Sequence, residues 1–563
     1  MPTPEYNSVL RNQYHNAALS KLADDYIAAL LEFSPQMGAY LGLHEYDGLA
    51  PDRSAKSIAR HVKASHKLLE RAAKLEADPS LDPDEQLDLT MLRLSLQAEL
   101  QRTEELRLFN RQPILYNEYL EVSNYILQDY KPLAERIASL IEYERSFPAT
   151  IAAARANLDA RLPQAWLEQG LIFYRGQLDF LSGQLAETVR NVADPKQVTE
   201  FEPVNAAAAQ AVSEFVTWLE GKLADADPDF ALGGEAFTQL VKYNEGVDLS
   251  LDELIAAGEA DLKRNEETLR ATAAQIDPKK TAEELLVEQS ANHSTEESLL
   301  ADTTAKLERI RQFIIEHDII SIPNAEHCKV IETPPYMRYS FAFMYTPGPF
   351  EQEKVDSYYF VTPVEQDWSE AQKEQWLRFL DHYSMQDISI HEAYPGHYVH
   401  FMHANRIEGQ PLRKMMGSYA FIEGWAHYCE QMMLEQGYSA GDPHLRMAQL
   451  RQALVRDCRY IVAMKMHGQG MSLDEATQFL MQHAFMDELP ARTEARRGTF
   501  DFLYFGYTLG KLLILKLRRD LMAEQGAEFD LKQFHDKLLS YGAPQVPLVR
   551  RMMLADADAG GVL

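Results

Sequence analysis

Apolar residues recur three and four positions apart along most of this chain. The spacing is clear in LDLTMLRLSLQAEL (87–100) and in LIFYRGQLDFLSGQLAETV (171–189), and few β-branched runs interrupt it before residue 210. A period of three and four places apolar side chains on one face of a helix. Asp82 followed by Pro83 suits an N-cap and a first helical position. The pattern predicts an all-α N-terminal region.

The helical pattern continues in the second half of the chain, with one interruption. It covers residues 251–276 and 298–318, and it resumes after Trp368. At about 328–363 the chain is instead rich in aromatic and β-branched residues, with Pro and Gly at the turns, which is typical of short strands. We therefore expect a mainly α fold with one small β-sheet.

A short segment between helical patterns is the best candidate for a domain boundary. The segment DADPDFALGGEAF (225–237) gathers proline, two glycines and acidic residues, a composition that marks linkers. We predict an N-terminal all-α region at 1–230 and a second region, which contains the sheet, at 231–563. The chain holds no run of about 18 apolar residues, so membrane insertion is not expected.

Charge and cysteine content reduce the number of possible partners and metal ligands. The chain has 85 acidic and 55 basic residues, a formal net charge of -30, which would repel a phosphate backbone and argues against a nucleic-acid partner. The three cysteines form no CxxC pair, so a metal would need His and carboxylate ligands. The first residues lack the pattern of an export signal, and a cytoplasmic location is expected. Composition does not indicate an oligomeric state.

The segment SIHEAYPGHYVHF (389–401) carries the strongest chemical signal. Zinc peptidases of the HExxH type place two histidines one helical turn apart, with the glutamate between them facing a bound water. Here Pro395 stands where the second histidine would be, and the next histidine is His397. On a regular helix a step of six residues rotates a side chain by about 240°, so His391 and His397 would point to different sides.

Pro395 resolves this conflict because it cannot belong to a regular helix. It has no N–H to donate to the carbonyl of His391, and its ring clashes there, at a cost of roughly 3 kcal/mol. Gly396 supplies backbone freedom for a bulge or break at 393–396, which would return His397 to the place of an i+4 histidine. We predict His391 and His397 as zinc ligands and Glu392 as general base. A Pro-Gly helix break with two incidental histidines is the alternative.

A third ligand is expected on the helix predicted at 421–434. Glu423, His427 and Glu430 lie there at i, i+4 and i+7, hence on one face. We predict Glu423 as the third ligand. His427 and Glu430 are candidates to orient a ligand or to bind substrate, with simple exposure to solvent as the alternative.

Three further positions near the motif carry weaker signals. His400 and His403 follow His397 at i+3 and i+6. We expect His400 to be a histidine of the helix surface, with competition for the metal as the alternative. Asp387 precedes His391 by four residues and is a candidate to orient an imidazole.

Three protein ligands leave one coordination position for a water, whose pKa zinc can lower to about 7. Glu392 is expected to take the proton of that water and pass it to the leaving amine. A donor for the oxyanion is also needed, and we predict Tyr507 for this role. Tyr504, three residues earlier, and Arg497 are expected to bind substrate, Arg497 through a carboxylate. The alternative for the tyrosines is packing in the core.

Two of these motifs resemble the paired motifs of a known family. HEAYPGH (391–397) and EGWAHYCE (423–430) match HExxPGH and EGWAxYxE of the bacterial family called domain of unknown function 885. The resemblance covers most of the chain, including YTLGKLLILKLR (507–518), SYYFVTP (357–363) and SPQMGAYLGLHEYDG (34–48).

Members of that family are similar to gluzincin metallopeptidases, which include helical oligopeptidases and carboxypeptidases. The resemblance implies a large helical metallopeptidase fold with a small β-sheet next to the active-site helices and a deep cleft. It also implies Glu423 as a metal ligand. It further implies an edge strand at 358–362 that aligns a peptide substrate, where Tyr359 would contact it.

The residues and the resemblance together predict a zinc-dependent metallopeptidase with one zinc ion per chain, acting on short peptides. Residues 231–563 would form its catalytic region. The alternatives are a zinc-dependent amide or ester hydrolase acting on a non-peptide substrate, an iron oxygenase with the same ligands, and a helical binding protein with a degenerate site. Endopeptidase, carboxypeptidase and dipeptidase activities all stay open.

Overall fold

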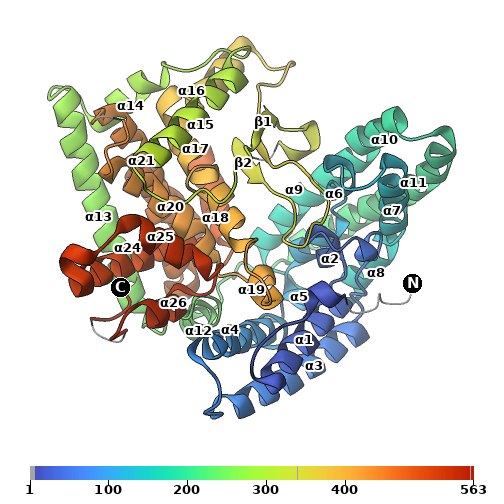
Figure 1. The fold of residues 1–563 in the computed structure, drawn as a ribbon. Helices are drawn as coiled ribbons and strands as arrows, with labels where there is room; N and C mark the ends of the chain where they lie inside the picture. The colour runs from blue at the N-terminus through green and yellow to red at the C-terminus, as the bar shows by residue number, and fades with distance from the viewer. Residues whose placement is uncertain (1–6, 339, 440, 558–559) are drawn as a thin grey trace. The chain divides into compact units, whose positions relative to one another are not determined.

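Helices dominate the fold, as the spacing of apolar residues predicts (Figure 1). The structure is a computed structural model that describes residues 7–338, 340–439, 441–557 and 560–563. Its internal contacts divide the chain into two compact units. Unit 1 comprises Met1–Leu232, Pro347–Asp356 and Glu408–Met415, and unit 2 comprises Gly233–Thr346, Ser357–Ile407 and Met416–Leu563.

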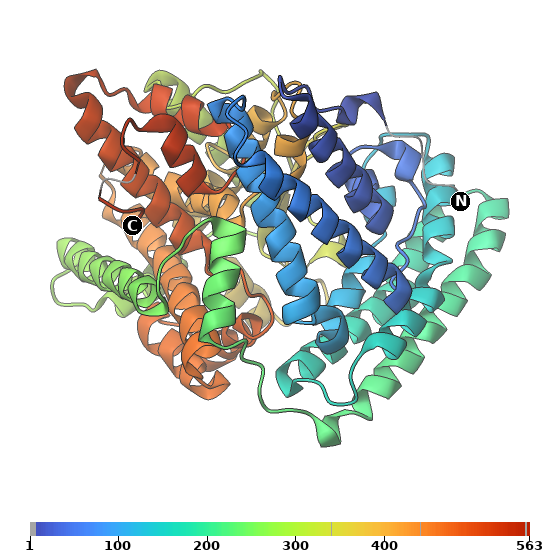
Figure 2. The same ribbon diagram turned by 90° about the horizontal axis from the view of Figure 1, so that it is seen from below.

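Unit 1 is built from helices and short helical turns. Its α-helices are α1 (Ala17–Phe33), α2 (Gln36–Tyr40), α3 (Ala55–Leu75), α4 (Pro83–Leu100), α5 (Leu108–Arg111), α6 (Asn124–Leu127), α7 (Leu133–Glu144), α8 (Phe147–Asn157), α9 (Gln164–Phe180), α10 (Ala186–Val192), α11 (Pro195–Glu220) and α19 (Pro411–Met415). The 3₁₀ turns are η1 (Ser8–Leu10), η2 (His44–Tyr46), η4 (Pro113–Leu120) and η6 (Leu223–Asp225), and the π-helical turns are η3 (Gln101–Glu105) and η5 (Leu181–Leu185). Helices α3 and α4, in blue, pack against each other (Figure 2).

Local sequence and distant segments both stabilise unit 1. Asp82 caps α4 by accepting a hydrogen bond from the backbone N–H of Glu85, whose side chain binds back to Asp82, as the Asp-Pro pair predicts. Arg413 of α19 joins the unit through a buried ion pair with Asp88 of α4, at 2.6 Å. Segments more than 300 residues apart in sequence therefore share one core.

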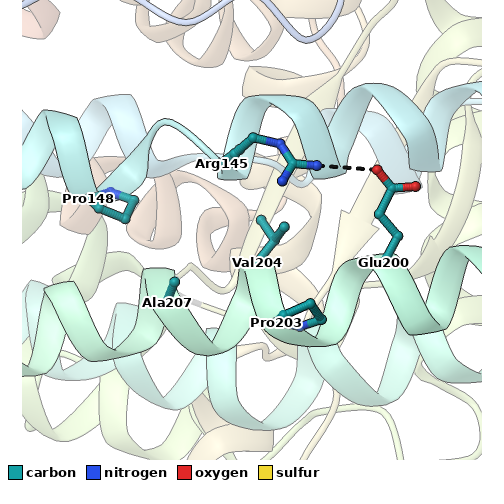
Figure 3. A pocket seen from close by; sticks show the side chains of 6 residues that line it. All are labelled: Arg145, Pro148, Glu200, Pro203, Val204 and Ala207. Atoms are coloured by element: carbon teal, nitrogen blue, oxygen red, sulfur yellow. Dashed lines mark hydrogen bonds and ion pairs between the residues drawn. The ribbon is translucent and has the colours of Figure 1, made fainter.

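A surface groove of about 400 Å³ lies between α8 and α11 of unit 1 (Figure 3). Its lining residues are Arg145, Pro148, Glu200, Pro203, Val204 and Ala207. Arg145 and Glu200 pair with each other at 3.2 Å, so the two charges of the groove neutralise one another. None of the predicted site residues lines it.

Unit 2 contains the predicted site. Its helices are α12 (Gly234–Glu245), α13 (Leu251–Ile276), α14 (Ala282–Ser290), α15 (Leu299–Glu316), α16 (Glu370–Phe379), α17 (His382–Glu392), α18 (His397–Ala404), α20 (Tyr419–Glu435), α21 (Pro443–Gln469), α22 (Leu473–Ala484), α23 (Glu488–Gly498), α24 (Gly506–Gln525), α25 (Leu531–Ser540) and α26 (Val546–Met553), with 3₁₀ turns η7 (Pro335–Met337) and η8 (Gly526–Glu528). Among the described residues, no helix is both long enough and apolar enough to cross a bilayer.

The predicted small sheet is present and has three strands. They are β1 (Lys329–Glu332), β2 (Ala342–Tyr345) and β3 (Tyr358–Val361), in the order β1-β3-β2. Strand β3 runs parallel to β1 and antiparallel to β2, so Tyr359 lies between Val330 and Met344. The prediction of an edge strand at 358–362 is therefore wrong. The continuous apolar run of β3 is buried, as suits a central strand.

Helices α20 and α24 of unit 2 pack closely against each other. A Cβ atom on Gly510 of α24 would lie 1.6 Å from the carbonyl oxygen of Ala420, and one on Gly424 would lie 2.3 Å from the Cα of Gly510. Because these are contacts between backbones, which cannot move aside, only glycine fits at either position. The two helices consequently touch without an intervening side chain.

We expect Gly510→Ala to lower the melting temperature by roughly 5 °C or more, because the added methyl group forces α20 and α24 apart. Gly176→Ala in α9 is the matched control, since a Cβ atom there meets nothing within 4 Å. The control is expected to keep or slightly raise the melting temperature, as helix propensity favours alanine. Calorimetry on both variants measures the difference, and equal melting temperatures would contradict the close packing.

Candidate metal centre

The helix carrying the first motif breaks where the sequence predicts. Helix α17 ends at Glu392 and α18 begins at His397, with a cis peptide between Tyr394 and Pro395. Gly396 packs so tightly against the end of α17 that a Cβ atom there would lie 1.7 Å from the carbonyl oxygen of His391. The break therefore needs glycine at 396, and it brings the start of α18 back against the last turn of α17.

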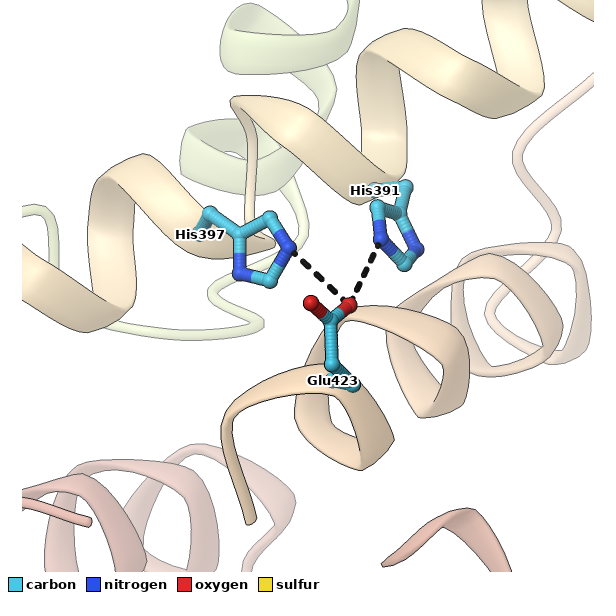
Figure 4. A group of neighbouring side chains, drawn as sticks. All are labelled: His391, His397 and Glu423. Carbon is cyan, nitrogen blue, oxygen red and sulfur yellow. Dashed lines mark ion pairs between the residues drawn. The ribbon is translucent and has the colours of Figure 1, made fainter. Parts of the chain in front are cut away.

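The structure brings His391, His397 and Glu423 together (Figure 4). The Nε2 atom of each imidazole lies 3.4 Å from Oε2 of Glu423, and the candidate ligand atoms all lie within 4.8 Å of one another. Two ligands that bind one zinc ion at 2.0–2.1 Å and at the tetrahedral angle are about 3.3 Å apart. The spacing thus fits a single ion between the three side chains.

Two polar atoms of this group, Oε2 of Glu423 and Nδ1 of His397, are buried without a hydrogen bond among the described residues. Oε2 of Glu423 makes no hydrogen bond within the described part of the chain, although it faces two imidazole nitrogens. Burial alone would raise the pKa of Glu423, but the imidazoles of His397 and His391 hold it below its ordinary value. A buried carboxylate oxygen without a hydrogen bond is unusual in proteins, and a cation between these residues would account for it.

Glu430 orients the imidazole of His391. Its Oε1 lies 2.7 Å from Nδ1 of His391, and a carboxylate can only accept, so Nδ1 carries the proton. In the neutral imidazole the lone pair then lies on Nε2, which faces Glu423 and is the atom that would bind a metal. Glu430 is fully buried, and its Oε1 forms an ion pair with Nη2 of Arg456 at 3.0 Å. A carboxylate behind a ligating histidine is a common device of zinc sites.

The other polar residues near the motif are buried rather than exposed. Nδ1 of His427 donates to Glu430 at 3.0 Å, and burial lowers the pKa of His427 to about 3. Asp387 is also buried, but neither of its oxygens has a hydrogen bond among the described residues, so it does not orient His391. His400 and His403 bind backbone carbonyls, those of Gly542 and Ser321. The expectation that His400 lies on a helix surface is wrong, because this residue is fully buried, whereas His403 is half-buried.

Glu392 lies at the end of α17, directly after the first candidate ligand. Its Oε2 accepts a hydrogen bond from the backbone N–H of Met344, at 3.0 Å. Met344 belongs to β2, so the edge strand beside the centre is β2 rather than β3. No partner is found for Oε1 of Glu392 in the described residues, and this oxygen is free to act on a proton.

Tyr507 and Arg497 are close enough to interact electrostatically. The ring centroid of Tyr507 lies 6.2 Å from that of His391, and its hydroxyl accepts a hydrogen bond from Tyr419. Arg497, on α23, pairs with Asp501 through Nε and Nη2 at 2.9 and 2.8 Å, and its side chain is 33% exposed. Tyr507 is thus near the centre, and Arg497 keeps a face toward solvent.

Two predicted substrate contacts do not fit their positions. The side chains of Tyr504 and Tyr359 are both 0% exposed, so neither can touch a substrate. The hydroxyl of Tyr504 packs against Gly498, and that of Tyr359 lies 3.3 Å from Ser389 of α17. Both predicted substrate contacts are therefore wrong, because these tyrosines pack in the core, which was the alternative for Tyr504.

Sequence reasoning missed a pair of arginines on α21. The guanidinium groups of Arg456 and Arg459 lie 5.5 and 5.4 Å from the centre of the Tyr507 ring. Arg459 also binds Glu494 through two hydrogen bonds of 2.8 Å. The available signal was the placement of charged residues inside an otherwise apolar helix, which is rare unless the charges are paired.

We expect His397→Ala and Glu423→Ala to lose bound zinc, because each removes one of three ligands. Glu430→Gln is expected to bind zinc about 10–100-fold more weakly, since it leaves the ligands but weakens the orientation of His391. Competition with a zinc-binding dye measures the affinities. His403→Ala, on the same helix as His397, is the control and should keep zinc. Unchanged affinity in Glu423→Ala would exclude this centre.

Comparisons with known proteins cover most of the chain. Two solved structures share its fold. One is a provisionally assigned lipoprotein of unknown function from Shewanella oneidensis, with TM-score 0.80, 24% identity and coverage of 95% of this chain and 100% of that one. The other is a provisionally assigned lipoprotein from Colwellia psychrerythraea, with TM-score 0.78, 17% identity and coverage of 95% of this chain and 98% of that one. No curated protein matches the sequence. The model of a family described as bacterial protein of unknown function (DUF885) matches residues 35–553, and the chain therefore belongs to this family.

Proposed function

We propose that this protein is a zinc-dependent metallopeptidase whose ion is held by His391, His397 and Glu423. The observation that carries the proposal is the buried oxygen of Glu423, which lies 3.4 Å from both imidazole nitrogens and has no hydrogen bond among the described residues. Three protein ligands are typical of catalytic zinc, whereas structural zinc usually has four. Nitrogen and oxygen donors of this kind suit zinc.

When bound, zinc at such a centre supplies a Lewis acid that polarises the scissile carbonyl and lowers the pKa of water to about 7. Glu392 then acts as general base: Oε1 accepts a proton from the attacking water and passes it to the nitrogen of the leaving amine. The N–H of Met344 binds the other oxygen, at 3.0 Å. This bond keeps the carboxylate in one orientation while the proton moves.

Tyr507 is the proposed donor to the oxyanion that forms on the substrate carbonyl. Its ring lies beside that of His391, and burial raises the pKa of its phenol, so the hydroxyl keeps its proton at neutral pH. A preorganised donor of this kind accounts for about 10²–10³-fold in kcat. The negative charge of Glu423 adds to the rise in pKa.

Arg497 is the proposed contact for a substrate carboxylate. Its Nε and Nη2 bind Asp501, which leaves Nη1 without a partner among the described residues. A planar guanidinium recognises carboxylates well, because its donors are fixed in a fork. Peptides short enough to place their C-terminal carboxylate on Arg497 would be the preferred substrates.

We expect Glu392→Gln to keep zinc and to lower kcat by about 10²–10⁴-fold, because an amide cannot accept the proton. A peptide library with products identified by mass spectrometry provides the assay. Glu435→Gln is the control, since Glu435 is an exposed residue of α20 that pairs with Arg518. A zinc-loaded protein that cleaves no peptide but hydrolyses simple esters or amides would replace the peptidase proposal with the non-peptide hydrolase.

For Arg497→Gln we expect KM to rise about 10-fold or more for peptides with a free C-terminus, as a charge-assisted hydrogen bond is lost. C-terminally amidated peptides should show no such change. Arg492→Gln, on the same helix and paired with Asp474 at the surface, is the matched control. An equal rise in KM for free and amidated peptides would exclude carboxylate recognition by Arg497.

A further inference from the structure

Two tyrosine hydroxyls from different helices meet beside the metal centre. The hydroxyl of Tyr419, the first residue of α20, donates to the hydroxyl of Tyr507 on α24, at 3.3 Å. The two rings meet edge to face, with their centroids 5.8 Å apart and their planes at 87°. Tyr419 has no role in the function proposed so far.

Tyr419 is tied to a candidate metal ligand by the helix that carries both. It precedes Glu423 by four residues, which places the two side chains on one face of α20, one turn apart. The start of this helix is anchored by the buried carboxylate of Glu245, which accepts hydrogen bonds from Ser418 and from the backbone N–H of Ala420. The distance from Tyr419 to the ligand is therefore set by a rigid element.

Close packing also limits where the ring of Tyr419 can lie. A Cβ atom on Gly506 would be 2.6 Å from Cδ1 of Tyr419, so the ring rests directly on the backbone of α24. Gly506 is the residue before Tyr507. The two hydroxyls thus meet because the ring of one tyrosine packs against the backbone that carries the other.

The ring of Tyr507 is held as well. It lies 6.2 Å from the ring of His391 at an angle of 22°, and two guanidinium groups of α21 lie within 5.5 Å of its centre. With the ring in place, the position of the hydroxyl hydrogen is the main freedom left. A phenol has one hydrogen to donate and can also accept, so the bond from Tyr419 occupies an acceptor position and leaves the hydrogen of Tyr507 available.

We propose that Tyr419 is a positioning residue, whose hydroxyl directs the O–H of Tyr507 toward an oxygen bound at the metal centre. The inference rests on the proposed zinc site and extends it to a residue that does not touch the substrate. Accepting a hydrogen bond also polarises a hydroxyl and makes it a better donor. Tyr419 therefore acts only through Tyr507, and this dependence can be measured.

The test measures the affinity of the zinc-loaded protein for acetohydroxamate, which binds zinc and presents a negatively charged oxygen. Calorimetry compares the unaltered protein with Tyr419→Phe, Tyr507→Phe and the double variant. We expect Tyr507→Phe to weaken binding about 10-fold or more and Tyr419→Phe about 5-fold, as a charge-assisted bond is lost or misdirected. In the Tyr507→Phe background, Tyr419→Phe should cause no further loss, because the residues are coupled.

Tyr428→Phe is the matched control on the same helix. Its hydroxyl is buried and contacts His535 at 2.8 Å and Arg518 at 3.0 Å, so its loss removes a hydroxyl from α20 without reaching Tyr507. Zinc content and acetohydroxamate affinity should stay as in the unaltered protein. A Tyr419→Phe effect of equal size in both backgrounds, or no effect at all, would overturn the inference.

Turnover of peptides separates this inference from the proposed function. If the coupled losses of affinity occur but no peptide is cleaved, Tyr419 is confirmed as a positioning residue and the peptidase proposal fails. If peptides are cleaved and Tyr419→Phe changes neither the affinity for acetohydroxamate nor kcat, the peptidase proposal stands and the inference fails. With both correct, Tyr419→Phe lowers kcat while KM changes little.

Discussion

The backbone contact between α20 and α24 is the constraint on which the metal centre depends. Gly424 and Gly510 meet with no side chain between them. Gly424 directly follows Glu423, and Gly510 lies one turn after Tyr507 on the other helix. Because backbones in contact have little room to shift, the contact sets the separation of the candidate ligand and the candidate donor. A larger residue at either glycine would change this separation although all the candidate ligands were still present.

Buried polar contacts also hold α24, one of these two helices. Lys511 of α24 pairs with Asp261 of α13 at 2.7 Å, and Thr508 donates to Asp457 of α21 at 3.0 Å. Burial lowers the pKa of Lys511 to about 8, although the charge of Asp457 opposes this. Removing one member of a buried ion pair typically costs about 3–5 kcal/mol, because its partner keeps an uncompensated charge. Helix α24 is therefore held in place by α13 and α21.

The orientation of the candidate ligands follows from a chain of polar contacts behind them. Arg456 holds Glu430, Glu430 holds the imidazole of His391, and the imidazole presents Nε2 toward Glu423. Each bond removes one rotational freedom from the group in front of it, so the innermost atoms are oriented before a ligand arrives. Glu392 is also oriented by a neighbour, since the backbone of the edge strand β2 donates a hydrogen bond to one of its oxygens and the other oxygen stays available.

The sequence by itself determined the helices, the small sheet and the break at 393–396, because these depend on local spacing and on the special backbones of Pro395 and Gly396. Only the tertiary structure decided which strand is central, that Tyr504 is buried, and that Glu430 and Tyr419 face the centre. Such properties arise from contacts between segments far apart in the chain. Helical periodicity states which residues share a face, but the identity of the neighbour covering that face comes only from packing.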